Sequence, residues 1–132
     1  MKSAIYTANT TATTLAVGDL VPLGSTIRRF GCNLRQDENT ITATGRGYYD
    51  VAAIITAIPT AAGTITATLL KDGVPVTGAT ASATVAAAAT VVTLPIKALV
   101  RNLTDCDSSI LALRLGGAAG QVTNVALVAE KA

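Results

Sequence analysis

The segment from Gly45 to Pro59, Gly-Arg-Gly-Tyr-Tyr-Asp-Val-Ala-Ala-Ile-Ile-Thr-Ala-Ile-Pro, constrains the fold of this chain more than any other. Glycines mark a turn at its start, and a proline ends it. We interpret it as a central strand with two alternating sides. One side carries Tyr49, Val51, Ala53, Ile55 and Ala57. The other carries Tyr48, Asp50, Ala52, Ile54, Thr56 and Ile58. Because neither side is strongly polar after Asp50, we expect both sides to be covered.

The core that this strand would join consists mainly of small side chains. Of the 132 residues 50% are hydrophobic, but only 3% are aromatic and none is Trp. Burial contributes roughly 25 cal/mol per Å² of apolar surface, and Ala has little surface to bury. In a single domain over residues 1–132, the stabilisation from apolar burial would therefore exceed the cost in conformational entropy only narrowly. We expect a homo-oligomer that buries the second side of the strand, with interface residues Tyr48, Tyr49, Val51, Ile54 and Ile55.

Short runs of Thr, Val and Ile with alternating polarity recur along the chain, separated by turn residues. This pattern predicts an all-β sandwich with about eight to ten short antiparallel strands. Asp72-Gly73 between two alternating runs predicts a tight hairpin. Pro95 predicts an edge position or a bulge for its strand. The other expected strands are 3–8, 14–17, 20–23, 26–33, 40–44, 63–70 and 90–101.

Three segments are harder to interpret. The run Arg35–Asn39 is the most polar of the chain, and we expect a solvated loop there. Alanine favours helix but the interspersed Thr, Ser and Val do not, so residues 79–90 are predicted as strand and loop, with a short helix as the alternative. The runs Ser109–Leu115 and Gln121–Ala129 are predicted to form a closing hairpin around a flexible glycine loop.

Charge and hydropathy exclude several partners. Charged residues are only 14% of the chain and the formal net charge is +2, which is too weak and scattered for a nucleic-acid surface. The first residues lack the apolar core of a secretory signal, so we expect no signal peptide. No run is long enough to cross a membrane, so we expect no membrane insertion.

The chain contains no histidine, which is the commonest general base and the proton carrier of catalytic triads. We therefore expect no enzyme and no cofactor. Asp105 and Asp107 could hold Ca²⁺ or could simply cap a surface turn. The carboxylates of Asp37, Glu38 and Asp50 could in principle support glycoside hydrolysis, but a solvated loop explains the first two better.

The arginines and the cysteines each have more than one possible role. An anion such as phosphate or sulfate could bind near a symmetry axis, or the arginines could form ordinary ion pairs with Asp50, Asp105 or Asp107. The arginines concerned are Arg28, Arg29, Arg46 and Arg101. Cys32 and Cys106 could be free, partly buried thiols, one disulfide, or metal ligands.

Two segments, Gly45–Ala57 with its Gly-x-Gly-Tyr-Tyr start and Ala98–Leu115, resemble the trimeric jelly roll of the complement globular-head and tumour-necrosis-factor type. Four blocks are similar to small proteins of bacteriophages and prophages of gut Firmicutes. These blocks are Arg28–Asn33, Gly47–Val51, Leu70–Ala79 and Pro95–Arg101.

The resemblance implies a homotrimer and a non-enzymatic structural role in the phage virion, as a head decoration or a fibre knob. It implies capsid or other virion proteins as partners and synthesis in the bacterial cytoplasm. The alternative function is a carbohydrate- or cell-surface-binding jelly-roll module.

Overall fold

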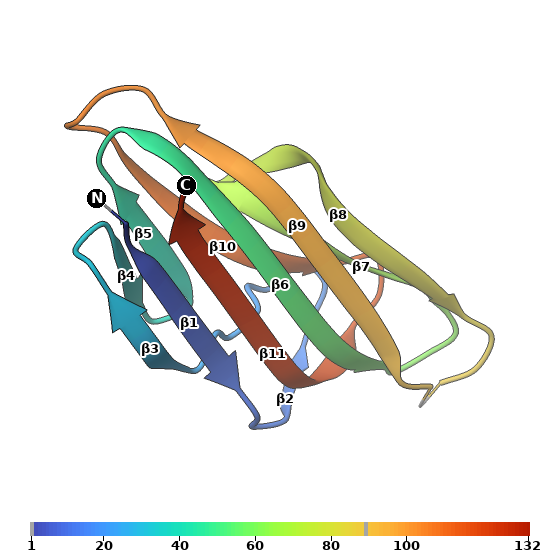
Figure 1. The fold of residues 1–132 in the computed structure, drawn as a ribbon. Coiled ribbons are helices and arrows are strands. Elements are labelled where there is room, and N and C mark those ends of the chain that lie inside the picture. The colour runs from blue at the N-terminus through green and yellow to red at the C-terminus, as the bar shows by residue number, and fades with distance from the viewer. Residues whose placement is uncertain (1, 89) are drawn as a thin grey trace.

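The structure is a computed structural model that describes residues 2–88 and 90–132. Within these residues every regular element is a β-strand, and the strands form two antiparallel sheets that face each other (Figure 1). The predicted all-β jelly-roll sandwich is therefore confirmed. The strands are β1 (Ala4–Asn9), β2 (Thr13–Leu15), β3 (Ser25–Phe30), β4 (Leu34–Asp37), β5 (Thr40–Thr44), β6 (Gly47–Pro59), β7 (Gly63–Lys71), β8 (Val74–Val85), β9 (Val92–Asn102), β10 (Ser108–Gly116) and β11 (Gly120–Lys131).

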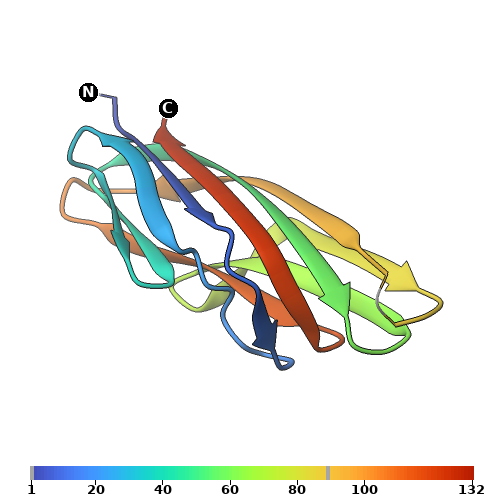
Figure 2. The ribbon, with the colours of Figure 1, turned by 90° about the horizontal axis from the view of Figure 1, so that it is seen from below.

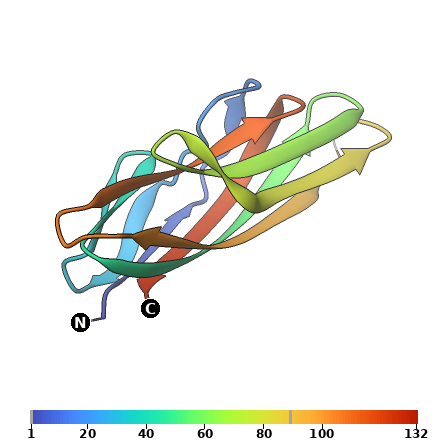
Figure 3. The same cartoon turned by 90° about the horizontal axis from the view of Figure 1, so that it is seen from above.

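The two sheets have different strand orders. The first sheet runs β3-β1-β11-β6-β9, with β2 paired to β11, and the second runs β4-β5-β10-β7-β8. Figures 2 and 3 show these sheets as two layers of an elongated sandwich, with the two chain ends close together at one end. The edges of the two sheets are β3 and β9 in the first, and β4 and β8 in the second.

Strand β6 is an interior strand of the first sheet, between β11 and β9. Its two sides differ, as the alternation predicts, but only one of them is covered. Tyr49, Val51 and Ile55 are 0% exposed, whereas Ile54 on the other side is 49% exposed. The second sheet covers one side of β6, and the other side is open on the single chain, where its burial by further copies remains a prediction.

The core between the sheets is aliphatic, with one exception. Tyr49 is the only aromatic side chain that is buried in the described part of the chain. The remaining core consists of Leu, Ile, Val and Ala from both sheets. Alternation places these side chains inward on β7 and β9 as well, where Ile65 and Leu69, and Leu94 and Ile96, are almost fully buried.

Local signals for turns and edges are confirmed. Asp72 and Gly73 join β7 to β8 with φ angles of 54° and 82°, the positive values that a tight hairpin needs at both central positions. Pro95 lies on β9, which is an edge strand, so that the missing N–H on this residue is tolerated there.

Three predictions about segments were wrong. Residues 34–37 form β4 instead of a loop, because Leu34 is fully buried and anchors an otherwise polar strand against β5. Residues 20–23 form no strand and have only an isolated bridge from Leu20 to Arg114. Residues 14–17 are strand only at their start, in β2. By contrast, β8 continues through Val85 and turns follow it, so the prediction of strand and loop for residues 79–90 is confirmed where the structure describes them, and residue 89 lies outside the described residues.

The predicted closing hairpin is also wrong. β10 pairs with β5 and β7 in the second sheet, whereas β11 pairs with β1 and β6 in the first. The glycine segment between them therefore crosses from one sheet to the other. At Gly117, with φ of 75°, an added Cβ would lie 2.3 Å from the carbonyl oxygen of Thr64, so this crossing is a tight turn that accommodates only glycine.

Candidate interaction surfaces

The outward side of the first sheet carries exposed apolar side chains on all five main strands. The strand register places Tyr6 opposite Val128 and Val128 opposite Ala52, in one row across β1, β11 and β6. A second row brings together Ala8, Ala126, Ile54 and Pro95. We call this surface the apolar face, and it comprises Tyr6, Ala8, Phe30, Ala52, Ile54, Pro95, Leu99, Ala126 and Val128.

Charged groups of both signs lie around the apolar face. Asp50 of β6 lies opposite Glu130 of β11, so two acidic residues are adjacent near one end of the strands. Lys97 lies across from Ala52, and its Nζ is 3.8 Å from a carboxylate oxygen of Asp50. Because both groups of this pair are partly exposed, it contributes little stability. The basic side chain of Arg28 lies across from Tyr6, at the β3 edge.

A shallow hollow of about 190 Å³ lies within the apolar face. Its lining is almost wholly apolar and comes from β1, β3 and β11: Ala4, Ile5, Tyr6, Arg28, Phe30 and Val128. Phe30 is 60% exposed beside it. A concave apolar surface with exposed aromatic rings suits contact with a protein more than contact with water.

The five residues that we expected at an oligomer interface divide between two environments. Tyr48 and Ile54 are exposed on the outward side of β6, at 47% and 49%, and for them the interface remains a prediction. Tyr49, Val51 and Ile55 point into the sandwich and are 0% exposed. Their side chains cannot contact a second copy, because strand alternation sends them to the core. The two tyrosines thus lie on opposite sides of β6, as the alternation predicted.

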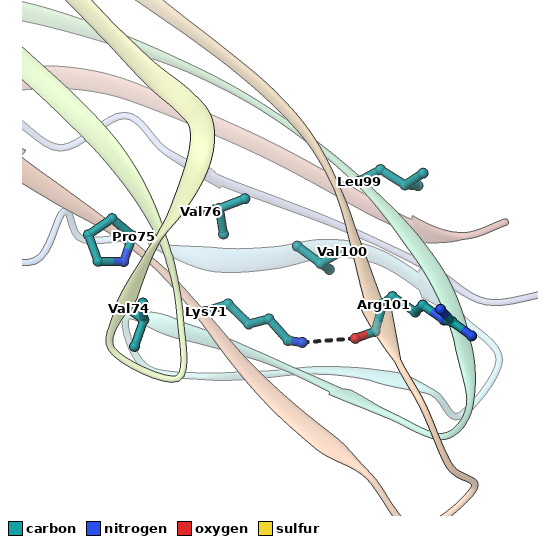
Figure 4. Close-up of a pocket in the computed structure, with 7 residues that line it drawn as sticks. All are labelled: Lys71, Val74, Pro75, Val76, Leu99, Val100 and Arg101. Carbon is teal, nitrogen blue, oxygen red and sulfur yellow. Dashed lines mark hydrogen bonds between the residues drawn. The ribbon is translucent and has the colours of Figure 1, made fainter.

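A second apolar surface lies at the edge of the sandwich, where β8 of one sheet and β9 of the other separate. A groove of about 310 Å³ is lined there by Lys71, Val74, Pro75, Val76, Leu99, Val100 and Arg101 (Figure 4). We call it the edge groove. Nζ of Lys71 donates a hydrogen bond to the carbonyl oxygen of Arg101 at 2.8 Å, which ties the two sheets together along this edge. Leu99 lines the groove and also lies on the outward side of β9, where it is opposite Asp50 and between Lys97 and Arg101.

The arginines do not form the expected ion pairs. Within the described residues, Lys97 and Asp50 make the only salt bridge. The guanidinium of Arg101 instead lies over the ring of Tyr48, 5.4 Å from its centroid. Such a cation–π contact holds the exposed tyrosine in place at the end of β6.

A buried polar network closes the sandwich at the β5–β6 turn. The Tyr49 hydroxyl is within 2.9 Å of the carbonyl oxygens of both Thr44 and Gly45. Asn102 donates from Nδ2 to the carbonyl oxygens of Ala43 and Gly45, and its Oδ1 accepts a hydrogen bond from Ser109. Burial raises the pKa of the Tyr49 hydroxyl above its ordinary value, against a smaller lowering effect of Asn33.

This raised pKa predicts a loss of stability at alkaline pH. The folded state holds the Tyr49 proton more tightly than the unfolded state, so the stabilisation is complete below the unfolded pKa of about 10 and is lost as the pH rises through the folded pKa. We expect the free energy of unfolding, measured by urea titration, to fall above about pH 10. Tyr49→Phe should remove this part of the decline and cost about 0.5–1.5 kcal/mol at neutral pH.

Tyr48→Phe is the matched control, because it removes a neighbouring hydroxyl that lies outside the core. The alkaline decline should persist in this variant. An equal effect of both substitutions on the pH dependence would contradict the role given to the buried hydroxyl.

The acidic turn is a capped loop. Oδ2 of Asp107 accepts hydrogen bonds from the backbone N–H groups of Leu103 and Thr104, at 2.8 and 3.0 Å. These bonds, that of Thr104 most, lower the pKa of Asp107 below its ordinary value. No group of three or more His, Cys, Asp or Glu suited to a metal ion occurs in residues 2–88 and 90–132. The carboxylate of Asp107 therefore caps a surface turn, which is one of the two roles considered from the sequence.

The two cysteines are free thiols in surface turns. Cys32 lies between β3 and β4, and Cys106 lies between β9 and β10. Both are exposed, so the expectation of partial burial is wrong. The described part of the chain contains no helix with the length and hydropathy needed to cross a lipid bilayer.

No protein-family model and no curated protein matches this sequence. Among solved structures, the chain is similar to murine APRIL, with a TM-score of 0.75, 11% identity and 100% coverage of both chains. The fold is a tumour-necrosis-factor-like jelly roll. The globular domain of zebrafish complement 1qA shares this jelly roll, with a TM-score of 0.66, 11% identity, and coverage of 96% of this chain and 94% of that one.

A viral protein has a similar fold. The vertex protein P5 of phage PRD1 matches with a TM-score of 0.58 and 13% identity, over 98% of this chain and 95% of that chain. At these identities the likeness concerns the jelly roll alone. What the protein does must therefore be argued from its own surfaces.

Proposed function

We propose that the protein is a non-enzymatic, homotrimeric binding module that serves as a structural part of a phage particle. The observation that carries this proposal is the apolar face. It leaves Ile54, Leu99 and Phe30 about half or more exposed on one side of a single chain. A monomer would keep this contiguous apolar surface in contact with water, whereas assembly would remove it.

A closed ring of three copies needs two different surfaces on each copy, because each copy meets its two neighbours through unlike patches. The apolar face and the edge groove are two such surfaces, and Leu99 belongs to both. The projecting β8–β9 edge is 65% exposed at Val74 and is apolar at Val76 and Pro75. Placing this edge of one copy against the apolar face of the next would bury both surfaces.

Two observations support the proposed place in a phage particle, one from the sequence and one from the fold. The sequence blocks described above resemble small phage and prophage proteins, and a vertex protein of phage PRD1 has a similar fold. The absence of histidine from the sequence agrees with a role that requires no acid–base catalysis.

Two measurements test the proposal. Light scattering on the purified protein should give three times the chain mass of 13.2 kDa. Mass spectrometry of phage particles induced from the host strain should detect the chain in the purified particle fraction. A monomer at micromolar concentration would contradict the assembly, and particles that lack the chain would contradict the role in the virion.

A further inference from the structure

A small polar hollow lies where β3, β4 and β5 meet, apart from the apolar face and the edge groove. Its volume is about 150 Å³, and its lining consists of Arg29, Cys32, Asn33, Arg35, Thr42 and Thr44. Since one water occupies about 30 Å³ of liquid, the hollow can hold one small polar group together with a few waters. No acidic side chain contributes to its lining.

The fold brings both arginines of the hollow to the same site. Nε of Arg29 donates to the carbonyl oxygen of Leu34 at 2.5 Å, which leaves the two terminal NH₂ groups of this guanidinium for another acceptor. Arg35 of β4 lies directly across from Thr42 of β5, so both side chains are on the same side of the second sheet. Two positive charges therefore come to one site from different strands.

No carboxylate neutralises these charges. Neither Arg29 nor Arg35 has an ion-pair partner within the described residues, where Lys97 and Asp50 make the only pair. Asp37 follows Arg35 by two positions on β4 and still forms no ion pair with it. Uncompensated positive charge in a concave site attracts an anion.

The remaining lining supplies donors and a rigid wall. Asn33 donates from Nδ2 to the carbonyl oxygen of Thr44 at 2.7 Å, and its Oδ1 accepts from the hydroxyl of Ser3 at 2.8 Å. The side chain of Asn33 is thus fully engaged and fixes the turn. The hydroxyls of Thr42 and Thr44 make no hydrogen bond within residues 2–88 and 90–132, so they remain available to a ligand.

We propose that this hollow binds one oxyanion group: a phosphate, a sulfate or a carboxylate. Arg29 and Arg35 would provide the charge and the forked donors that match such groups, and the threonine hydroxyls would complete the contacts. The site lies outside the surfaces proposed for assembly, so a monomeric variant retains it. A ring of three copies would present three such sites.

Cys32, which lies in the lining of the hollow, provides a direct measurement. Alkylation by iodoacetate, an anion, is compared with alkylation by neutral iodoacetamide, followed by mass spectrometry of the peptides. The ratio of the two rates at one thiol cancels the reactivity of that thiol itself. We expect this ratio at Cys32 to fall roughly two- to fivefold in Arg29→Gln and again in Arg35→Gln, the size expected from loss of one surface charge.

Two controls make the measurement specific. Arg28→Gln removes the same charge from the neighbouring position of β3, whose side chain faces the other side of the sheet, and should leave the ratio at Cys32 unchanged. Cys106, in the turn between β9 and β10 and outside the lining of the hollow, should keep its own ratio in all variants. An equal effect of Arg28→Gln and Arg29→Gln would show a general effect of net charge and would overturn the proposal.

Competition identifies the ligand chemistry. Sodium phosphate, sulfate or acetate should slow alkylation of Cys32 by iodoacetate about threefold or more relative to chloride at the same ionic strength, and should not protect Cys106. Stronger protection by polyphosphate than by inorganic phosphate at equal phosphate content would assign the site to a polymer. Equal rates in all four salts would overturn the proposal. The same protection in the monomeric Ile54→Lys variant would separate this result from the proposed assembly.

Discussion

Ile54→Lys is expected to convert the proposed trimer into monomers. Ile54 lies in the middle of the apolar face, between Ala126 of β11 and Pro95 of β9. Burying an isoleucine side chain contributes about 1.5–3 kcal/mol, and burying an unpaired ammonium group in its place costs several kcal/mol in each copy. Light scattering should therefore report the single-chain mass of 13.2 kDa.

The matched control is Ile110→Lys. Ile110 lies on the outward side of the second sheet and is 47% exposed, against 49% for Ile54. Both substitutions place the same charge on an exposed strand position, so both should leave the folded chain intact by circular dichroism. Only Ile54→Lys should change the mass of the assembly that light scattering reports. Loss of assembly in both variants, or in neither, would contradict the role of the apolar face.

Ile55→Ala is expected to destabilise the folded chain by about 2–5 kcal/mol, the cost of removing a large aliphatic side chain from a core. Ile55 is 0% exposed and belongs to a core with few large side chains. Its neighbours are mainly other aliphatic side chains that cannot collapse fully into the space left behind. Because a protein of this size has a total stability of about 5–15 kcal/mol, the variant should unfold at a much lower urea concentration.

Ile54→Ala, one residue earlier, is the control for this prediction. The side chain of Ile54 is outside the core, so its removal should affect association instead of the fold. The destabilisation by Ile55→Ala should be independent of protein concentration, whereas that by Ile54→Ala should vanish on dilution to the monomer. Equal losses of stability in the two variants, both independent of protein concentration, would mean that the two sides of β6 are buried alike.

Alternation along the chain predicted which residues of β6 share a side, because side chains of a strand point to opposite sides whatever the strand pairs with. It also explains the partial error at the predicted interface. Tyr49, Val51 and Ile55 were included with Tyr48 and Ile54 because both sides of β6 are apolar. Polarity alone could not tell the side that the second sheet covers from the side that it leaves open.

The polar hollow was only partly foreseeable. Arg29 was among the candidate anion-binding residues, but Arg35 lay in a run interpreted as a solvated loop. A single buried residue, Leu34, converts that run into β4 and brings Arg35 across from Thr42. One apolar position in a polar run is a weak signal, so the sequence offered little to reveal the second arginine of the site.

The sequence by itself determined the all-β class, the tight Asp72-Gly73 turn, the edge position or bulge at Pro95 and the sets of residues that share a side of each long strand. These features depend on local geometry, which each short segment carries alone. Only the tertiary structure decided that β10 and β11 belong to different sheets, that β4 is a strand, and that one side of β6 stays open. Those outcomes depend on contacts between residues far apart in the chain, and similar apolar strands satisfy several pairings until the whole sandwich selects one.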